Sequence, residues 1–110
     1  MLKKLLLTLP ILLLSNDKFI QPDSFTKEGY CVVEKSKQRH IGLTRFDNPE
    51  DFKKYCNGKM IFRYKNSNCK VFTMEQMKFD IFISDGKIKH LFKIGERKRI
   101  CSKQIIESLK

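Results

Sequence analysis

A chain of 110 residues has room for one small domain, and its 23 Lys and Arg residues against 12 Asp and Glu give a formal net charge of +11. Such a surface attracts anionic partners and repels further copies of the same chain. The sequence holds no Gly-rich phosphate loop, no His-Glu-x-x-His or Gly-x-Ser-x-Gly motif and no Asp-rich calcium loop. We therefore expect no catalytic residue, no metal site and no cofactor.

The chain begins with an apolar segment. Lys3 and Lys4 precede an uncharged run at residues 5–14, and Ser15 follows it. A helix of that run would be about 15 Å long, which is about half of a bilayer's hydrocarbon core. The pattern is typical of a secretory signal peptide at residues 1–15, so we predict cleavage, export to a periplasmic or extracellular location and no transmembrane anchor. The alternative is an apolar helix packed in the domain.

The predicted mature chain divides into two segments. Residues 16–29 are polar with scattered apolar positions, which predicts an irregular N-terminal arm. Residues 30–110 are expected to form one small disulfide-stabilised domain. At its start, Tyr30–Val33 is rich in β-branched and aromatic residues and predicts a short strand. A charged connection follows, and His40–Phe46 is expected to be a second strand.

Residues 48–57 carry the signals of a helix start and a helix end. Asn48 supplies a capping side chain before Pro49, and two acidic residues follow in the first turn, where the helix dipole favours them. Gly58 stands where a left-handed residue commonly ends a helix. A helix this short is held by packing, so we expect Phe52 and Tyr55 to contact the sheet.

Alternation of apolar and polar residues predicts the sheet. Residues 59–65 and 69–74 alternate on either side of an Asn-Ser-Asn turn, and residues 77–94 form a hairpin. The Asp85-Gly86 pair is typical of a two-residue type I′ turn. That register places His90 opposite Ile81 on the apolar face.

The last segment, residues 102–110, is predicted to be a helix. Ser102 would cap it, and Ile105, Ile106 and Leu109 form one apolar stripe. Together the elements predict an α+β fold, with an antiparallel β-sheet (a meander of about four to five strands) and two short helices packed on one face.

Four cysteines in a short chain behind an export signal predict two structural disulfides. If residues 59–74 form a hairpin, Cys56 and Cys69 lie at opposite ends of the sheet, about 20 Å apart, which is too far for a disulfide. The 77–94 hairpin would then return the chain to the level of Cys56 just before Cys101, so we predict the pair Cys56–Cys101 and, by elimination, Cys31–Cys69. A different course of residues 95–100 would permit Cys31–Cys56 with Cys69–Cys101.

Basic residues interleaved with aromatic ones are the clearest functional signal. We predict that they bind an anionic partner, and the candidates are Lys59, Arg63, Lys65, Lys87, Lys89, Lys93, Arg97, Lys98 and Arg99. The predicted function is a non-enzymatic binding or inhibitory module that docks an acidic protein or an anionic envelope polymer. A nucleic-acid or phospholipid binder that uses the same cations is the first alternative, although an exported protein rarely meets nucleic acid. Lysines that only keep the protein soluble are the simplest explanation of the charge.

The two histidines suggest a further alternative, a small secreted hydrolase in which His40 or His90 moves a proton. His90 falls on the apolar side of the predicted hairpin, which favours a buried structural residue. His40 stands beside a basic run, which favours a solvated one. Neither histidine lies in a recognisable catalytic motif, and the sequence leaves the oligomeric state open.

Overall fold

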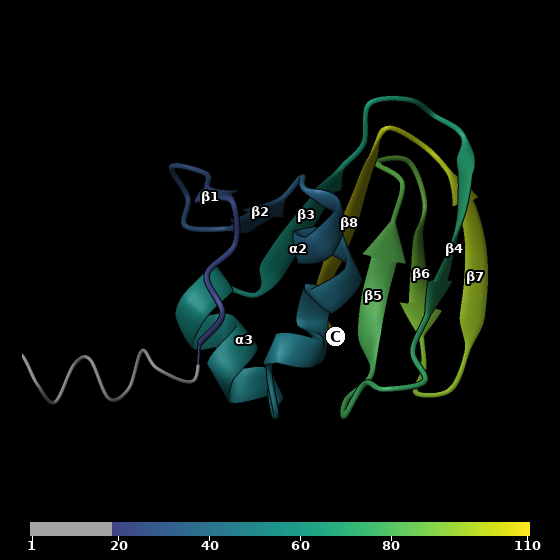
Figure 1. Cartoon of the computed structure of the whole chain (residues 1–110). Helices are drawn as coiled ribbons and strands as arrows, with labels where there is room; N and C mark the ends of the chain where they lie inside the picture. The colour runs from purple at the N-terminus through teal and green to yellow at the C-terminus, as the bar shows by residue number, and fades with distance from the viewer. Residues whose placement is uncertain (1–18) are drawn as a thin grey trace, which may run out of the picture.

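The computed structural model describes residues 19–110, and the fold is α+β as predicted (Figure 1). The predicted signal peptide and its cleavage site lie outside the described residues. In chain order the elements are β1 (Ser24–Phe25), β2 (Cys31–Val33), α2 (Ser36–Ile41), the 3₁₀ helix η2 (Gly42–Arg45), α3 (Pro49–Cys56), β3 (Lys59–Arg63), β4 (Cys69–Thr73), β5 (Ile81–Ser84), β6 (Lys89–Phe92), β7 (Arg97–Cys101) and β8 (Gln104–Leu109). Within residues 19–110, no helix is long and apolar enough to cross a membrane.

The strands form two sheets rather than one meander. The larger sheet has the order β1-β2-β3-β8-β5-β6, and β4 pairs only with β7 in a smaller, two-stranded sheet. β2 and β3 run parallel, and the other neighbours are antiparallel. The predicted 59–74 hairpin is therefore wrong, because the partner of β3 is the last strand of the chain. In Figure 1 α2 lies in front of β8, α3 lies near the start of β3, and β4 and β7 lie beside β6.

The predicted C-terminal helix is wrong, because residues 104–109 form strand β8. This strand pairs with β3 on one side and with β5 on the other. A nine-residue helix is marginal by itself, whereas the β-branched Ile105 and Ile106 suit a strand that hydrogen-bonds to two neighbours. Pairing with distant strands therefore overrides the helical stripe.

The predicted strand at His40–Phe46 is also wrong, because α2 and η2 occupy residues 36–45. The Asp23 carboxylate accepts hydrogen bonds from the backbone N–H groups of Glu34 and Lys35, at 2.5 and 3.0 Å, and so fixes the chain just before α2. Burial alone would raise the pKa of Asp23, but the two backbone hydrogen bonds and the nearby positive charges of Lys35 and Arg45 outweigh it and hold the pKa below its usual value. A capping partner this far upstream is not visible in the local sequence.

Helix α3 is confirmed, and its local signals work as predicted. Asn48 Oδ1 accepts from the backbone N–H of Asp51 at 2.8 Å, and Pro49 is the first helical residue. The helix ends at Asn57, which is left-handed, and at Gly58, whose φ is +81°. A Cβ on Gly58 would lie 3.3 Å from the Leu109 side chain, so glycine also allows α3 to meet β8 closely.

The 77–94 hairpin exists, but its register differs from the predicted one. Ile81 pairs with Phe92 and Ile83 with His90, so the loop spans four residues, 85–88. The Asp85 side chain accepts from the N–H groups of Lys87 and Ile88, at 2.9 and 3.2 Å, which closes the longer loop. His90 is exposed on the edge strand β6, and the predicted buried role for it is wrong.

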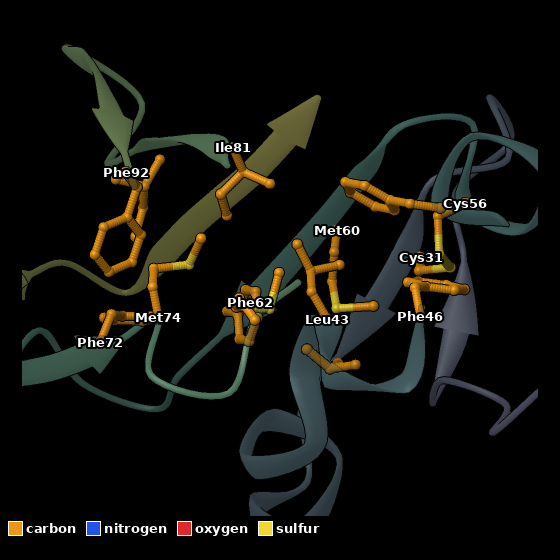
Figure 2. Close-up of a cluster of buried hydrophobic side chains, with 14 of the residues drawn as sticks. Cys31, Leu43, Phe46, Cys56, Met60, Phe62, Phe72, Met74, Ile81 and Phe92 are labelled. Carbon is orange, nitrogen blue, oxygen red and sulfur yellow. A yellow bond between two sulfur atoms is a disulfide. The ribbon is translucent and has the colours of Figure 1, made fainter. Parts of the chain in front are cut away.

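The core lies between one face of the larger sheet and the layer formed by the helices and the smaller sheet (Figure 2). Five of the core side chains are 0% exposed, namely Phe52, Met60, Ile81, Phe92 and Ile105. The aromatic rings also connect the layers, since Phe62 of β3 meets Phe72 of β4 edge to face at 5.6 Å between centroids.

Two disulfides are present as predicted, but their pairing is Cys31–Cys56 and Cys69–Cys101. The predicted Cys31–Cys69 and Cys56–Cys101 pairs are wrong, because they assumed that β4 returns beside β3. In fact β4 leaves the larger sheet and pairs with β7, which places Cys69 directly opposite Cys101. Disulfides are typical of proteins that fold outside a reducing cytoplasm.

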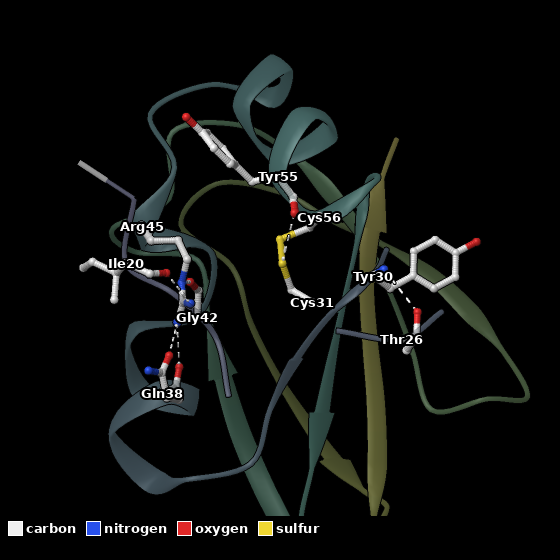
Figure 3. The surroundings of a disulfide bond; sticks show 9 residues. All are labelled: Ile20, Thr26, Tyr30, Cys31, Gln38, Gly42, Arg45, Tyr55 and Cys56. Atoms are coloured by element: carbon white, nitrogen blue, oxygen red, sulfur yellow. Dashed lines mark hydrogen bonds between the residues drawn. A yellow bond between two sulfur atoms is a disulfide. The ribbon is translucent and has the colours of Figure 1, made fainter. Parts of the chain in front are cut away.

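The two disulfides are expected to differ in their reduction, because only one is accessible. Cys31 of β2 and Cys56 at the end of α3 are both 0% exposed (Figure 3). Cys69 and Cys101 are exposed at the end of the smaller sheet. Limiting reductant followed by alkylation and peptide mass mapping should label Cys69 and Cys101 first. Simultaneous labelling of all four cysteines would contradict this expectation.

Candidate functional site

Two adjoining cavities lie where α2 faces the ends of β3 and β4. The larger one, which we call the basic groove, has a volume of about 720 Å³ and is lined by Glu34, Lys35, Ser36, Arg39, Arg63, Tyr64, Lys65, Asn66 and Lys70. The smaller one, which we call the inner cavity, has a volume of about 390 Å³ and is lined by Ser36, Arg39, His40, Ile41, Gly42, Leu43, Thr44, Phe62, Tyr64, Lys70, Val71, Phe72, Thr73, Met74, Met77 and Glu107. The two share Ser36, Arg39, Tyr64 and Lys70, so one wall serves both.

Three separate segments build the basic groove. Lys35 directly precedes α2, and Arg39 lies on that helix. Arg63 is the last residue of β3, and Lys65 follows it two residues later. Lys70 lies at the start of β4, after the turn that connects the two strands. Backbone bonding extends β3 past its end, since the N–H of residue 64 donates to the carbonyl of residue 103 at 2.8 Å. Neighbouring strand and helix backbones therefore hold these side chains around one cavity.

The basic groove carries five basic side chains against one carboxylate. Arg39 and Lys70 lie over the ring of Tyr64, at 4.5 and 4.2 Å from its centroid, which fixes both cations by cation–π attraction. Burial, the largest influence, raises the pKa of Tyr64, so its phenol stays neutral and does not cancel their charge. Arg63 lies 3.9 Å from Glu34, and both side chains are about half exposed, so this ion pair is weak. A positive field therefore remains in the groove.

The structure brings together only two of the nine predicted basic residues, Arg63 and Lys65. Lys59 and Lys89 line neither cavity. By the sheet register they share the open face of the larger sheet with Arg63, and each ammonium lies 5.0 Å from a ring centroid, of Tyr30 and Phe82 respectively. The others lie in the 85–88 loop, after β6 or on β7, namely Lys87, Lys93, Arg97, Lys98 and Arg99. Of these, Arg97 pairs with Glu75 at 2.8 Å, and Lys98 lies 5.8 Å from the Phe92 ring centroid.

Sequence reasoning missed three cations of the groove, Lys35, Arg39 and Lys70. The first two stand in a segment that was predicted to be a connection, and the third follows a turn that was predicted to lie in a hairpin. The alternation of Lys35, Lys37 and Arg39 was a usable signal, but only with the helix and its position known.

The inner cavity ends on a buried carboxyl group. Alternation along β8 places Glu107 on the covered face of the sheet, where its register partners are Met60 on β3 and Ile83 on β5. Glu107 is 6% exposed. Burial raises the pKa of Glu107 to about 8, and no other described residue hydrogen-bonds to or forms an ion pair with its carboxyl group. The side chain is therefore protonated and neutral at pH 7.

The two histidines differ in their relation to these cavities. His40 is exposed on α2 and lines the inner cavity, whereas His90 lines neither of the two cavities. Between residues 19 and 110, His, Cys, Asp and Glu side chains form no group of three or more that could hold a metal ion.

Comparison with known proteins gives no family for this chain. No protein-family model matches it, and neither the curated proteins nor the solved structures contain a significant match. The function is therefore argued from the two cavities.

Proposed function

We propose that this protein is an exported, non-enzymatic binding module whose basic groove docks an anionic polymer. The carrying observation is the convergence of Lys35, Arg39, Arg63, Lys65 and Lys70, from three segments, on one cavity that holds a single carboxylate. Lysines that serve only solubility need not gather around one cavity, and Lys87 and Lys93 line neither of the two. A periplasmic or extracellular location fits the two disulfides.

The shape of the site supports a thin, flexible partner. A concave groove between a helix and two strand ends admits a single polymer chain, whereas an acidic protein surface of ordinary curvature meets a flat or convex face. Two of the cations are arginines, whose planar forks suit the paired oxygens of carboxylate and phosphate groups. Carboxylate- or phosphate-bearing envelope polymers have this chemistry.

The open face of the larger sheet, which the helices do not cover, supports a nucleic-acid partner less well. This face presents Lys59, Lys89, Phe82 and Leu91. Proteins that bind single-stranded nucleic acids combine cations with aromatic side chains in a similar way. However, both ammonium groups lie over aromatic rings of the protein itself, so the rings are already covered.

A charge-matched pair of double variants tests the groove. Arg63→Gln/Lys65→Gln removes two positive charges from the groove, and Lys87→Gln/Lys93→Gln removes two from exposed positions outside it. With poly-L-glutamate and polyphosphate as probes, we expect the groove variant to bind about tenfold more weakly, because two exposed ion pairs contribute about 1.4 kcal/mol together. The control variant should change affinity by less than about threefold, and fluorescence-anisotropy titration measures both.

Salt dependence gives a second readout. Each cation that contacts the polymer releases counterions, so the groove variant should show a shallower fall of log affinity with log salt than the control variant. Equal losses in the two double variants would mean that net charge alone drives binding and would overturn the proposal. Binding of an acidic protein through Arg63 and Lys65, with neither polymer bound, would replace the polymer by a protein partner.

A further inference from the structure

Glu107 is a buried acid that the fold itself does not use. It is 6% exposed, it lines the inner cavity, and no described residue satisfies its carboxyl group. A buried polar group without a partner costs free energy, and a leucine at this point of β8 would pair equally well with Met60 and Ile83. A partner for this carboxyl group that comes from outside the chain accounts for its position.

The walls of the inner cavity are apolar next to this carboxyl group. They include Phe62 from β3, Leu43 from η2, Phe72 from β4 and Met74, which directly follows β4, and Figure 2 shows these side chains in the buried cluster. A volume of about 390 Å³ lies within the range of small-molecule sites. The cavity therefore suits a small ligand with an apolar body.

The rim of the inner cavity is cationic. Arg39 and Lys70 line it, and both are held over the Tyr64 ring that also separates the cavity from the basic groove. An ammonium ligand would meet this positive rim before it reached Glu107, whereas a carboxylate is attracted to it. Charge complementarity thus selects the sign of the ligand's head group.

We infer that the inner cavity binds a small amphipathic carboxylate, with its acid group at Arg39 and Lys70, its apolar body along Phe62 and Phe72, and a hydroxyl or carbonyl group at its far end hydrogen-bonded to Glu107. A neutral carboxyl group both donates and accepts, so it can satisfy either far-end group. This site lies beyond the proposed polymer-docking function and does not depend on it, because Glu107 does not line the basic groove.

The test compares three ligands of equal chain length on the full mature chain, namely ω-hydroxyoctanoate, octanoate and octylamine. Calorimetric titration should rank them in that order, with the hydroxyl group improving affinity about fivefold, as one net hydrogen bond of about 1 kcal/mol does. Methyl NMR locates the site, because Met74 and Met77 line the inner cavity and Met60 does not. The first two methyl signals should shift on titration more than that of Met60, which neighbours Glu107 across the strands but does not line the cavity.

Variants separate the parts of the site. Glu107→Leu should still bind octanoate but should lose the preference for the hydroxyl group, whereas Glu107→Gln should keep part of it. Arg63→Gln/Lys65→Gln should leave octanoate affinity unchanged. A wrong proposal for polymer binding in the basic groove can therefore be told apart from a wrong proposal for ligand binding in the inner cavity. Tighter binding of octylamine, a hydroxyl preference that survives Glu107→Leu, or no shift of Met74 and Met77 with any of the three ligands would overturn the inference.

Discussion

At pH 7 the free energy of unfolding of the Glu107→Gln variant is expected to be about 3 kcal/mol larger than that of the wild-type chain, so the variant is more stable. The reason is that the wild-type carboxyl group must take up a proton on folding, since its pKa is 4.5 in the exposed state and about 8 in the fold. Each pH unit by which the solution lies above the exposed-state pKa adds about 1.4 kcal/mol to this cost, up to the folded-state value. The amide of Gln is neutral in both states and avoids that cost.

The pH profile carries the same information with a definite sign. Below pH 4.5 the carboxyl group is protonated in both states, so it adds no pH dependence. Between pH 4.5 and about 8 the unfolded chain has released the proton and the native chain keeps it, so wild-type stability falls as pH rises. Above about 8 both states are ionised, and the loss is complete. The difference between Glu107→Gln and wild type should therefore grow steadily through this window.

Urea unfolding of the wild type and of Glu107→Gln at a series of pH values measures this difference. Glu28→Gln is the matched control, because Glu28 is exposed and its variant should follow the wild-type profile. Parallel profiles for wild type and Glu107→Gln would show that Glu107 ionises normally in the fold. In that case the carboxyl group would have water or another partner, and the neutral state on which its role in the inner cavity depends would fall.

The elements with strong local signals could be predicted from the sequence. Helix α3 has its capping side chain, its Pro and its left-handed end within ten residues, so nothing distant was needed to find it. The 77–94 hairpin was found for the same reason, while its register depended on the Asp85 side chain closing a longer loop. The fold class followed from these two elements.

The remaining elements depend on residues far apart in the chain. The start of α2 is fixed by Asp23, and β8 is a strand because β3 and β5 are available on both its sides. The disulfide pairing failed because the separation of β4 from the larger sheet is a tertiary property. It was the second of two pairings that the sequence left open.

The candidate site was only partly predictable for the same reason. Arg63 and Lys65 were found because strand alternation is a local pattern, whereas Arg39 and Lys70 reach the groove only through the placement of α2 and β4. Glu107 was hidden by the predicted helix, in which it lies off the stripe of Ile105 and Leu109. On a strand the same spacing puts all three residues on one face.

Arg45 is expected to be the most important polar side chain for holding α2 in place. It is 9% exposed, and its guanidinium donates to the carbonyls of Gly42 at 2.7 Å, Ile20 at 2.9 Å and Gln38 at 3.1 Å, and to the Gln38 side chain at 2.9 Å (Figure 3). Burial lowers its pKa to about 10, so it remains a cation at pH 7. One side chain thus joins the N-terminal arm, α2 and η2.

Arg45→Met should lower the free energy of unfolding by about 3 kcal/mol, because one buried and two part-buried carbonyl groups lose their donor together. Arg45→Lys should recover little of this, since a single ammonium cannot reproduce the planar fork that serves Ile20, Gln38 and Gly42. Arg97→Met is the control, because the Arg97–Glu75 pair is mostly exposed and should contribute less than about 1 kcal/mol. Urea unfolding of the three variants at pH 7 measures the differences. Helix α2 carries Arg39, whose backbone N–H donates to the Lys35 carbonyl at 2.9 Å. Arg45→Met should therefore also speed amide hydrogen exchange at Arg39. If Arg45→Met were as stable as Arg97→Met, packing alone would position α2.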